Sequence, residues 1–582
     1  MSKRIKKGII ASPGIRMGKA IVFRGDEIKI PKYHINEANL EKEIERFNDA
    51  LNKTKQEIIE IQNKIAEEKF NDLADIFSTH IMALEDPHFV ERARRKIRQE
   101  QRNAEWVIND ISIELINSLS QIDDDYLRER IVDVSDINKR LISNLQQKNK
   151  INLSDINEYS ILFASDLTPS ETALLNRQYI LAFVTDHGGK TSHTAIMARS
   201  MDIPAIVGMD DITSYVKNDD YVIVDAIHGE IIINPSQEEI GEYKKYQLEL
   251  EKIEEELSKL TTLPSVTTDS IEVFLYGNLE IPDEMENIKN HGAHGVGLFR
   301  TEFLFLGKNL PDEESQFQEY KKVVEFFNPY PVTIRTLDFG GDKIPGSMKF
   351  QREMNPFLGC RSIRFSLRNI EIFKTQLRAI LRASAFGKIK IMFPMISNLS
   401  ELIEAKKITH DVMDELRISG IPFDPDVKLG IMIEVPSAVI AADILAEEAD
   451  FFSVGTNDLV QYILAVDRSN EKIADIYNPL DISVLRFLKM MADTSHKYSI
   501  PISICGEMAG EAKYTMLLLG LGFLELSMSS KNLYLVKNVI RSVSMEECQN
   551  FAHHVLSLKK QEEIEQIFND VVFKKFPDLI LK

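Results

Sequence analysis

The first long stretch of the chain carries apolar residues at helical spacing. From Asn36 onward they recur at steps of three or four, interrupted only by Thr54: Leu40, Ile44, Phe47, Leu51, Ile58, Ile61 and Ile65. This repeat predicts one long amphipathic helix with a narrow apolar seam. Helical patterns continue to about Leu145, with breaks expected at Pro87 and at the Asp123–Asp125 run. We therefore expect a helical hairpin or bundle over residues 31–147.

Strand-like runs lie on both sides of this helical segment. Two precede it, Lys7–Ala11 and Lys19–Arg24, and five follow: Tyr159–Ala164, Ile180–Thr185, Ala205–Val207, Tyr221–Asp225 and Glu230–Asn234. The opening runs have no other sheet nearby to join. We therefore predict a discontinuous α/β domain, residues 1–30 plus 148–232, into which the helical bundle is inserted. The Glu- and Lys-rich stretch Glu238–Leu260 predicts a solvated linking helix within residues 233–262.

The remaining residues, 263–582, alternate short apolar runs with helical patterns. Eight runs are candidate strands: Glu272–Tyr276, Gly295–Phe299, Val332–Leu337, Lys390–Phe393, Leu429–Ile433, Phe451–Val454, Pro501–Ile504 and Phe523–Ser527. Eight strand–helix units in a segment of this length predict a (β/α)₈ barrel. The expected fold class is thus a multidomain α/β protein, in which an α/β domain with an inserted helical bundle is followed by a barrel.

Composition narrows the function classes. The net charge of −20 argues against nucleic acid as a partner, because binding its backbone needs clustered Lys and Arg. No run of eighteen apolar residues is present, so we expect no membrane insertion. Three cysteines in 582 residues argue against a disulfide framework and favour a reducing cytoplasm.

Reactive polar residues follow five of the eight predicted barrel strands. They are Arg300-Thr301-Glu302, Arg335 with Asp338, Glu434, Asn457-Asp458 and Cys505-Gly506-Glu507. In a barrel these positions meet at one rim. Arginines can clamp phosphate and carboxylate groups, Glu434 and Asp458 offer hard oxygen ligands for Mg²⁺, and a thiol can move a proton. The set favours a small, doubly anionic phosphate ester as substrate, although each residue alone has an ordinary structural explanation.

A second candidate site follows the predicted strand Ile180–Thr185. Gly188 and Gly189 lead to Lys190-Thr191-Ser192-His193, which opens an apolar helical pattern. Glycines let backbone N–H groups approach an anion, and the positive end of a helix favours a neutral, nucleophilic imidazole. The string alone could equally describe an ordinary glycine-rich turn.

Both candidate sites together resemble Enzyme I of the bacterial phosphoenolpyruvate-dependent sugar phosphotransferase system. The resemblance spans the whole chain and rests on long motifs in order: Gly8–Gly14, Asp166–Thr172, the His193 loop, Gly297–Glu302, Asn355–Gly359, Gly455–Asp458 and Cys505–Glu507. It implies a phosphoenolpyruvate-protein phosphotransferase that transfers a phosphoryl group from phosphoenolpyruvate to its own histidine and then to the small phosphocarrier protein HPr.

The resemblance also implies a role for each candidate residue. His193 would be the phosphorylated nucleophile, with Thr172 hydrogen-bonded to its ring and Gly188 and Gly189 supporting the loop. The substrate-binding residues would be Arg300, Arg335, Arg468, Asn457 and Asp458. Glu434 and Asp458 would hold Mg²⁺, and Cys505 would protonate the enolate to give pyruvate.

Larger-scale expectations follow from the same resemblance. The helical insert would dock HPr, the barrel would join two chains in a homodimer, and the α/β domain would swivel about the linking helix between its two phosphoryl-transfer partners. Lys190, His187 and Cys360 depart from the usual wording of the family's motifs.

Three other interpretations are open. A phosphoenolpyruvate synthase or pyruvate, phosphate dikinase would share both sites but also carry an ATP-grasp domain, and residues 36–146 are helical without a phosphate-binding glycine loop. A nitrogen-regulatory paralogue would carry a sensory domain before the shared core, whereas here the core motifs start at once. An inactive docking scaffold is the alternative outside the enzymes.

Overall fold

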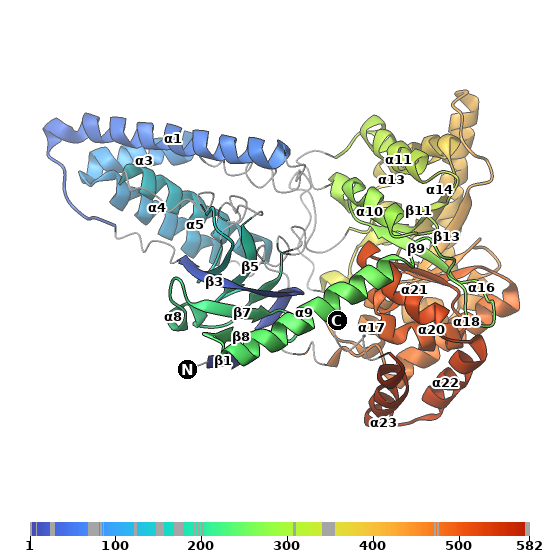
Figure 1. Ribbon diagram of the computed structural model, residues 1–582. Coiled ribbons are helices and arrows are strands. Elements are labelled where there is room, and N and C mark those ends of the chain that lie inside the picture. Colours follow the sequence, from blue (N-terminus) through green and yellow to red (C-terminus); the bar gives the residue numbers. More distant parts are fainter. Residues whose placement is uncertain are drawn as a thin grey trace. The chain divides into compact units, whose positions relative to one another are not determined.

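The computed structural model describes residues 3–6, 8–23, 30–67, 81, 84, 87–120, 125–146, 156–167, 171, 179–189, 194, 198, 203–305, 310–339, 355–468, 470, 473 and 476–576. The chain divides into two compact units, Met1–Glu249 and Leu250–Leu581. Helix α9 (Gln237–Ser258) contains the boundary between them (Figure 1).

The first unit contains a mixed eight-stranded sheet in the order β1-β8-β7-β3-β4-β5-β6-β2. Its strands are β1 (Lys3–Lys6), β2 (Ile9–Ser12), β3 (Ile15–Phe23), β4 (Ser160–Ala164), β5 (Ile180–Thr185), β6 (Ala205–Val207), β7 (Tyr221–Asp225) and β8 (Glu230–Ile233). Strands β3, β4, β5 and β6 run parallel, and the pairs toward both edges are antiparallel. Because β3 pairs directly with β4, the sheet joins segments on both sides of the helical insert.

Among the described residues, the insert contains the helices α1 (Leu40–Glu67), α3 (Pro87–Glu100), α4 (Ala104–Ser120) and α5 (Asp125–Leu145), which pack against one another (Figure 1). Its core is formed by the apolar seam of α1, where Ile44 and Phe47 are buried with residues of the other three helices. Arg46, which is partly exposed, binds two buried carboxylates of the insert, with Nη2 lying 2.6 Å from both Glu43 and Glu105. The predicted breaks agree with the structure, because α3 begins at Pro87 and α5 at Asp125.

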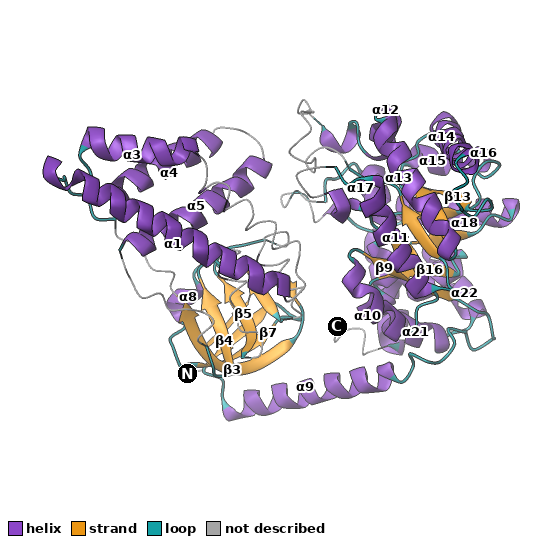
Figure 2. Ribbon diagram, turned by 90° about the horizontal axis from the view of Figure 1, so that it is seen from above, coloured by secondary structure: helices purple, strands orange, loops and turns teal. Residues whose placement is uncertain are grey.

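The second unit is a closed barrel of eight parallel strands with helices outside it (Figure 2). The strands are β9 (Phe274–Leu279), β10 (Val296–Phe299), β11 (Val332–Arg335), β12 (Ile389–Phe393), β13 (Lys428–Ile433), β14 (Phe452–Val454), β15 (Ile502–Ile504) and β16 (Glu525–Met528). Strand β16 pairs with β9 and so closes the ring.

The helices between and after the strands complete the barrel. They are α10 (Met285–Asn290), α11 (Glu313–Phe327), α12 (Ser362–Arg368), α13 (Ile370–Ala383), α14 (Leu399–Ile418), α15 (Pro436–Ile440), α16 (Ala442–Leu445), α17 (Thr456–Leu464), α18 (Ile482–Tyr498), α19 (Glu507–Gly510), α20 (Thr515–Leu521), α21 (Leu533–Arg541), α22 (Met545–Ser557) and α23 (Gln561–Ile567). Their inner faces and the strands form one continuous hydrophobic core.

The predicted fold class is therefore confirmed, and all eight predicted barrel strands form. Two boundaries were wrong in ways that affect the rim. Strand β9 runs to Leu279 rather than Tyr276, which brings Glu280 to its end. Strand β11 stops at Arg335 rather than Leu337, so Arg335 is its last residue. In the described part of the chain, no helix combines the length and apolar character needed to cross a membrane.

Candidate active site at the barrel rim

The predicted site residues of the barrel lie at the carboxyl ends of its strands. Arg300 follows β10, Arg335 ends β11, Glu434 follows β13 and Cys505 follows β15. Asn457 and Asp458 lie in the first turn of α17, directly after β14. Since all eight strands are parallel, these ends share one face of the barrel.

Two arginines are fixed at this face by a chain of carboxylates. Arg335 Nη2 donates to Glu302 Oε1 at 3.0 Å, and Arg335 Nη1 lies 2.8 Å from Asp338 Oδ2. Arg361 Nη2 lies 3.4 Å from the other oxygen of Asp338 and 3.3 Å from Asp458 Oδ2. The shared carboxylate holds the two guanidinium groups near each other, an arrangement suited to an anion with more than one charged group.

Arg361 was missed as a site residue by sequence reasoning. It lies at the end of the Asn355–Arg361 segment, far along the chain from β11, so no strand end points to it. Its selection depends on three-dimensional contacts with Asp338 and Asp458. The only sequence signal was its place directly after the Asn355–Gly359 motif and Cys360.

Glu434 is buried among other carboxylates. Its side chain is 2 % exposed, and its Oε1 accepts the backbone N–H of Met395 at 2.6 Å. Burial, followed by the negative charges of Asp338 and Asp458, raises the pKa of Glu434 well above its usual range. A divalent cation would relieve this repulsion, so the donor set fits a hard metal ion.

The protein contribution to such an ion would be small. Among the described residues, no group of three or more His, Cys, Asp or Glu side chains is arranged to hold a metal. Glu434 and Asp458 would supply two oxygens, and a substrate phosphate would have to contribute further ligands, as is usual for Mg²⁺.

Cys505 is a buried thiol facing the barrel interior. It is 3 % exposed and packs with Leu298, Met392 and Met432. Burial raises the pKa of the Cys505 thiol to about 11. The thiol therefore keeps its proton at neutral pH, as a proton donor requires.

The remaining predicted substrate-binding residues are nearer the surface. Arg300 pairs with Glu280, the residue brought to the rim by the longer β9. Arg468 Nη2 lies 3.9 Å from Asp458 Oδ1, and Arg468 Nη1 lies 3.4 Å from Glu507 Oε1. Asn457 also bonds to Glu507. The rim therefore brings together all six barrel residues that the sequence predicted for the substrate and the metal.

The glycine loop of the first unit is only partly described. Buried strand β5 leads to it, Gly188 adopts φ +119°, and the hydroxyl of Thr185 donates to His187 O at 2.7 Å. A Cβ on Gly208 would lie 2.9 Å from Gly188 O, so the glycine loop passes close to the residue that follows β6. His193 and Thr172 lie outside the described residues, and their assignments stay predictions.

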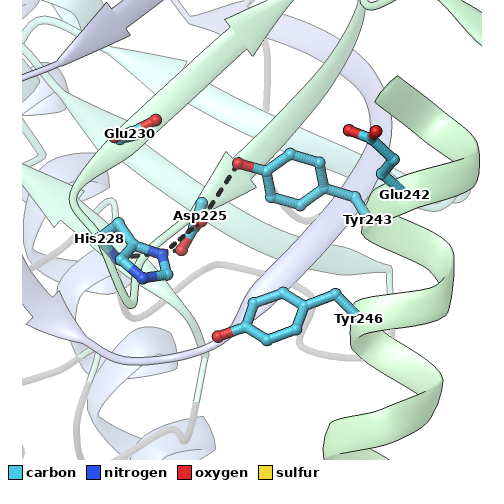
Figure 3. A pocket seen from close by; sticks show the side chains of 6 residues that line it. All are labelled: Asp225, His228, Glu230, Glu242, Tyr243 and Tyr246. Atoms are coloured by element: carbon cyan, nitrogen blue, oxygen red, sulfur yellow. Dashed lines mark hydrogen bonds and ion pairs between the residues drawn. The ribbon is translucent and has the colours of Figure 1, made fainter. Parts of the chain in front are cut away.

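A separate cavity of about 290 Å³ lies between the β7–β8 hairpin and α9 (Figure 3). It is lined by Asp225, His228, Glu230, Glu242, Tyr243 and Tyr246. Asp225 Oδ2 lies 2.8 Å from His228 Nδ1 and accepts from the hydroxyl of Tyr243 at 3.3 Å. This network ties α9 to the sheet. None of the predicted site residues lines the cavity.

Comparison with known proteins gives three family matches along the chain. Residues 7–130 match the N-terminal domain of PEP-utilising enzymes, residues 156–229 their mobile domain, and residues 254–545 their PEP-binding domain.

Curated relatives match over nearly the full length. The phosphoenolpyruvate-protein phosphotransferase of Haemophilus influenzae is 42% identical over 568 residues, covering 97% of this chain and 99% of the relative. The protein of that name from Buchnera aphidicola subsp. Acyrthosiphon pisum is 44% identical over 567 residues, again covering 97% and 99%. An Enzyme I solution structure determined by NMR is 40% identical, covers 42% of this chain and 100% of its own, and gives a TM-score of 0.39.

Proposed function

The chain belongs to the phosphoenolpyruvate-protein phosphotransferase family, and we propose that it carries the phosphoryl group of phosphoenolpyruvate on His193 and passes it to a histidine of HPr. The observation that carries this proposal is the barrel rim, where fixed arginines, buried carboxylates and a buried thiol lie at strand ends on one face. This first transfer would start sugar uptake by the phosphotransferase system.

In this proposal the arginines of the rim bind the substrate anion. Arg300, Arg335 and Arg468 would contact the phosphate and carboxylate of the substrate, with the Asn457 amide as a further donor and Asp458 at the same place. Arg361 joins them, because it is held between Asp338 and Asp458 in the same network. Several guanidinium groups in fixed orientations suit a compact anion with two charged ends.

Mg²⁺ is the metal we assign to Glu434 and Asp458. When bound, it would offset the negative charge that gathers on the phosphoryl group during transfer. The position of Glu434 supports this assignment, since burial, followed by the negative charges of Asp338 and Asp458, raises the pKa of this carboxylate and a cation would offset both effects.

The reaction then divides into two parts. Nitrogen of the His193 imidazole attacks phosphorus, the bond from phosphorus to the enol oxygen breaks, and the enolate of pyruvate leaves. Cys505 donates its thiol proton to the methylene carbon of that enolate, giving pyruvate, and the thiolate recovers a proton from solvent. The raised pKa of Cys505 supports the role of donor, because the proton is present before the enolate forms.

We assign the parts of the chain accordingly. Residues 1–30 and 148–232 would form the phosphohistidine domain, with Thr172, Gly188 and Gly189 supporting His193. Residues 31–147 would dock HPr. Residues 233–262 would link the phosphohistidine domain to residues 263–582, which would bind phosphoenolpyruvate. Because in-line transfer needs near-contact with each partner in turn, the phosphohistidine domain must swivel between them.

The barrel also offers a surface for a homodimer. Ile403, Ile440, Ile444 and Met490 are exposed apolar residues on α14, α15, α16 and α18, four helices connected by mutual contacts. Apolar side chains exposed on helices that contact one another are candidates for an association surface. We propose this surface for a second copy of the chain, and a cytoplasmic location for the protein, in which its three cysteines stay reduced.

A pyruvate assay tests the proposal. Without HPr, purified protein with phosphoenolpyruvate and Mg²⁺ should release about one pyruvate per active site. With HPr it should turn over continuously, with label accumulating on HPr. Pyruvate formation that needs ATP or AMP would favour the synthase or dikinase alternative, and no pyruvate from folded, metal-loaded protein would favour the docking scaffold.

A further inference from the structure

Glu507 is an exposed residue with contacts that a surface glutamate does not need. Its side chain is 76 % exposed, so solvation alone would satisfy it. It nevertheless contacts both Asn457 and Arg468, two of the residues assigned above to the substrate. Sequence reasoning placed Glu507 at the end of a strand but gave it no task.

The start of α19, which carries Glu507, is held firmly against the first turn of α17, which carries Asn457. A Cβ on Gly506 would lie 1.8 Å from Thr456 Oγ1 and 2.7 Å from Thr456 N, so the two backbones are in direct contact. The N–H of Cys505 also donates to Val454 O at 3.1 Å. The backbone of Glu507 is therefore held in a fixed position relative to Asn457 by backbone packing.

Glu507 and Asn457 close a ring of two hydrogen bonds. The backbone N–H of Glu507 donates to Asn457 Oδ1 at 2.8 Å, and Asn457 Nδ2 donates to Glu507 Oε1 at 2.8 Å. A flipped amide would set its NH₂ group against the backbone N–H, so both bonds select the same orientation. One N–H of the Asn457 amide is used in this ring. Its second N–H can donate a hydrogen bond to a bound anion.

The same carboxylate oxygen of Glu507 also lies near the guanidinium group of Arg468. Glu507 Oε1 lies 3.4 Å from Arg468 Nη1, and the hydroxyl of Tyr477 donates to Asn457 O at 3.2 Å. At that distance and exposure the ion pair with Arg468 contributes little. The bond to the Asn457 amide is the stronger contact.

We propose that Glu507 is a positioning residue that fixes the orientation of the Asn457 amide for the substrate anion. The inference rests on the proposed function, since it takes Asn457 as a substrate-binding residue. Glu507 acts through Asn457 and does not touch the substrate itself.

The test is a thermodynamic cycle in the full-length chain carrying His193→Ala, which allows phosphoenolpyruvate to bind in the presence of Mg²⁺ without transfer. Glu507→Ala should weaken binding about five- to tenfold, which corresponds to about 1–1.4 kcal/mol, the net contribution of one ordinary hydrogen bond. Glu507→Gln should stay within about threefold, because its amide oxygen still accepts from Asn457. Glu563→Gln, at an exposed position on α23, is the matched control and should change nothing.

Coupling separates positioning from a structural role. In an Asn457→Ala background, Glu507→Ala should cost less than about twofold, because the group it orients is gone. Additive losses would overturn the proposal, as would equal losses in Glu507→Ala and Glu507→Gln, which would assign the effect to Arg468. If the His193→Ala parent itself fails to bind phosphoenolpyruvate while folded, both the proposed function and this inference fail. Normal binding by Glu507→Ala contradicts the inference alone.

Discussion

Gly506→Ala probes the backbone contact between the loop of Cys505 and the loop of Asn457. Gly506 has φ −74°, a value open to any residue, so alanine meets no conformational barrier there. Only space is at issue. The added Cβ would lie 1.8 Å from Thr456 Oγ1, 2.7 Å from Thr456 N and 2.9 Å from Thr456 Cβ.

These distances set the size of the effect. Rotating the Thr456 side chain removes the first contact, but the backbone nitrogen remains, and an ordinary contact of 3.4 Å requires the loops to open by about 0.7 Å. Overpacking of this kind costs about 1–3 kcal/mol of stability. Displacing Cys505 and Asn457 by a sizeable fraction of an ångström should reduce the rate about ten- to a hundredfold.

The assay is the rate of pyruvate formation with HPr, measured beside the thermal unfolding of the same sample. Gly510→Ala, on the short helix α19 that follows Gly506, is the control, because its Cβ would meet the flexible end of Asn532, with Nδ2 at 2.8 Å, and Met528 Cβ at 3.2 Å, with no backbone atom among its nearest neighbours. It should keep nearly normal activity. A Gly506→Ala protein with normal rate and unchanged melting temperature would refute the claim that these loops are in direct contact.

Three further changes test other parts of the account. Arg46→Met should destabilise the helical insert by about 2–4 kcal/mol in chemical unfolding, because it leaves buried Glu105 without its cationic partner. Burial raises the pKa of Glu105, but its hydrogen bonds to Arg46 and Asn103 outweigh burial and lower it. The stability contributed by the Arg46–Glu105 pair is therefore present above the ordinary glutamate pKa and should fade as pH falls below about 4. If the stability of Arg46→Met depended on acid pH as that of wild type does, this would be contradicted. With Mn²⁺ in place of Mg²⁺, adding phosphoenolpyruvate to wild type should change the spectroscopic signal of the metal, and Glu434→Gln should abolish this change. EDTA should stop pyruvate release until Mg²⁺ is restored. Metal binding that survives Glu434→Gln would remove Glu434 from the ligand set. Ile440→Glu should shift sedimentation toward monomer, whereas Ile418→Glu, at a position 87 % exposed at the end of α14, should not; equal behaviour of the two would place the dimer contact elsewhere.

Most of the fold could be predicted because the inner strands of the sheets are buried on both faces. Strands β5, β6 and β7 have the predicted bounds, and each is a nearly unbroken run of buried residues. Such runs contrast with the helical spacing around them, so period alone separates the two.

The strands whose bounds were misplaced or missed are those whose local sequence pattern conflicts with the packing around them. Gly277 and Asn278 resemble a turn, yet they lie inside β9, where α10 packs so closely that a Cβ on Gly277 would lie 2.3 Å from Ile288 Cγ2. Strand β1 (Lys3–Lys6) was missed because it is short, rich in Lys and Arg, and paired on one side only, as edge strands often are.

The site divides in the same way. Arg300, Glu434 and Cys505 could be predicted because each directly follows a strand, and strand ends converge in any barrel. Arg361 and Glu280 could not, since one reaches the rim from a distant loop and the other depends on where β9 stops. Contacts made across the chain have no local pattern.

The central claim is that phosphorus from phosphoenolpyruvate becomes bonded to His193. The most direct measurement incubates wild-type and His193→Ala proteins with phosphoenolpyruvate labelled on phosphorus, in the presence of Mg²⁺, and locates the label by peptide mapping. The account predicts acid-labile, base-stable label on the peptide that contains His193, in wild type only. Label that persists in His193→Ala, or no label in folded, metal-loaded wild type, would contradict it.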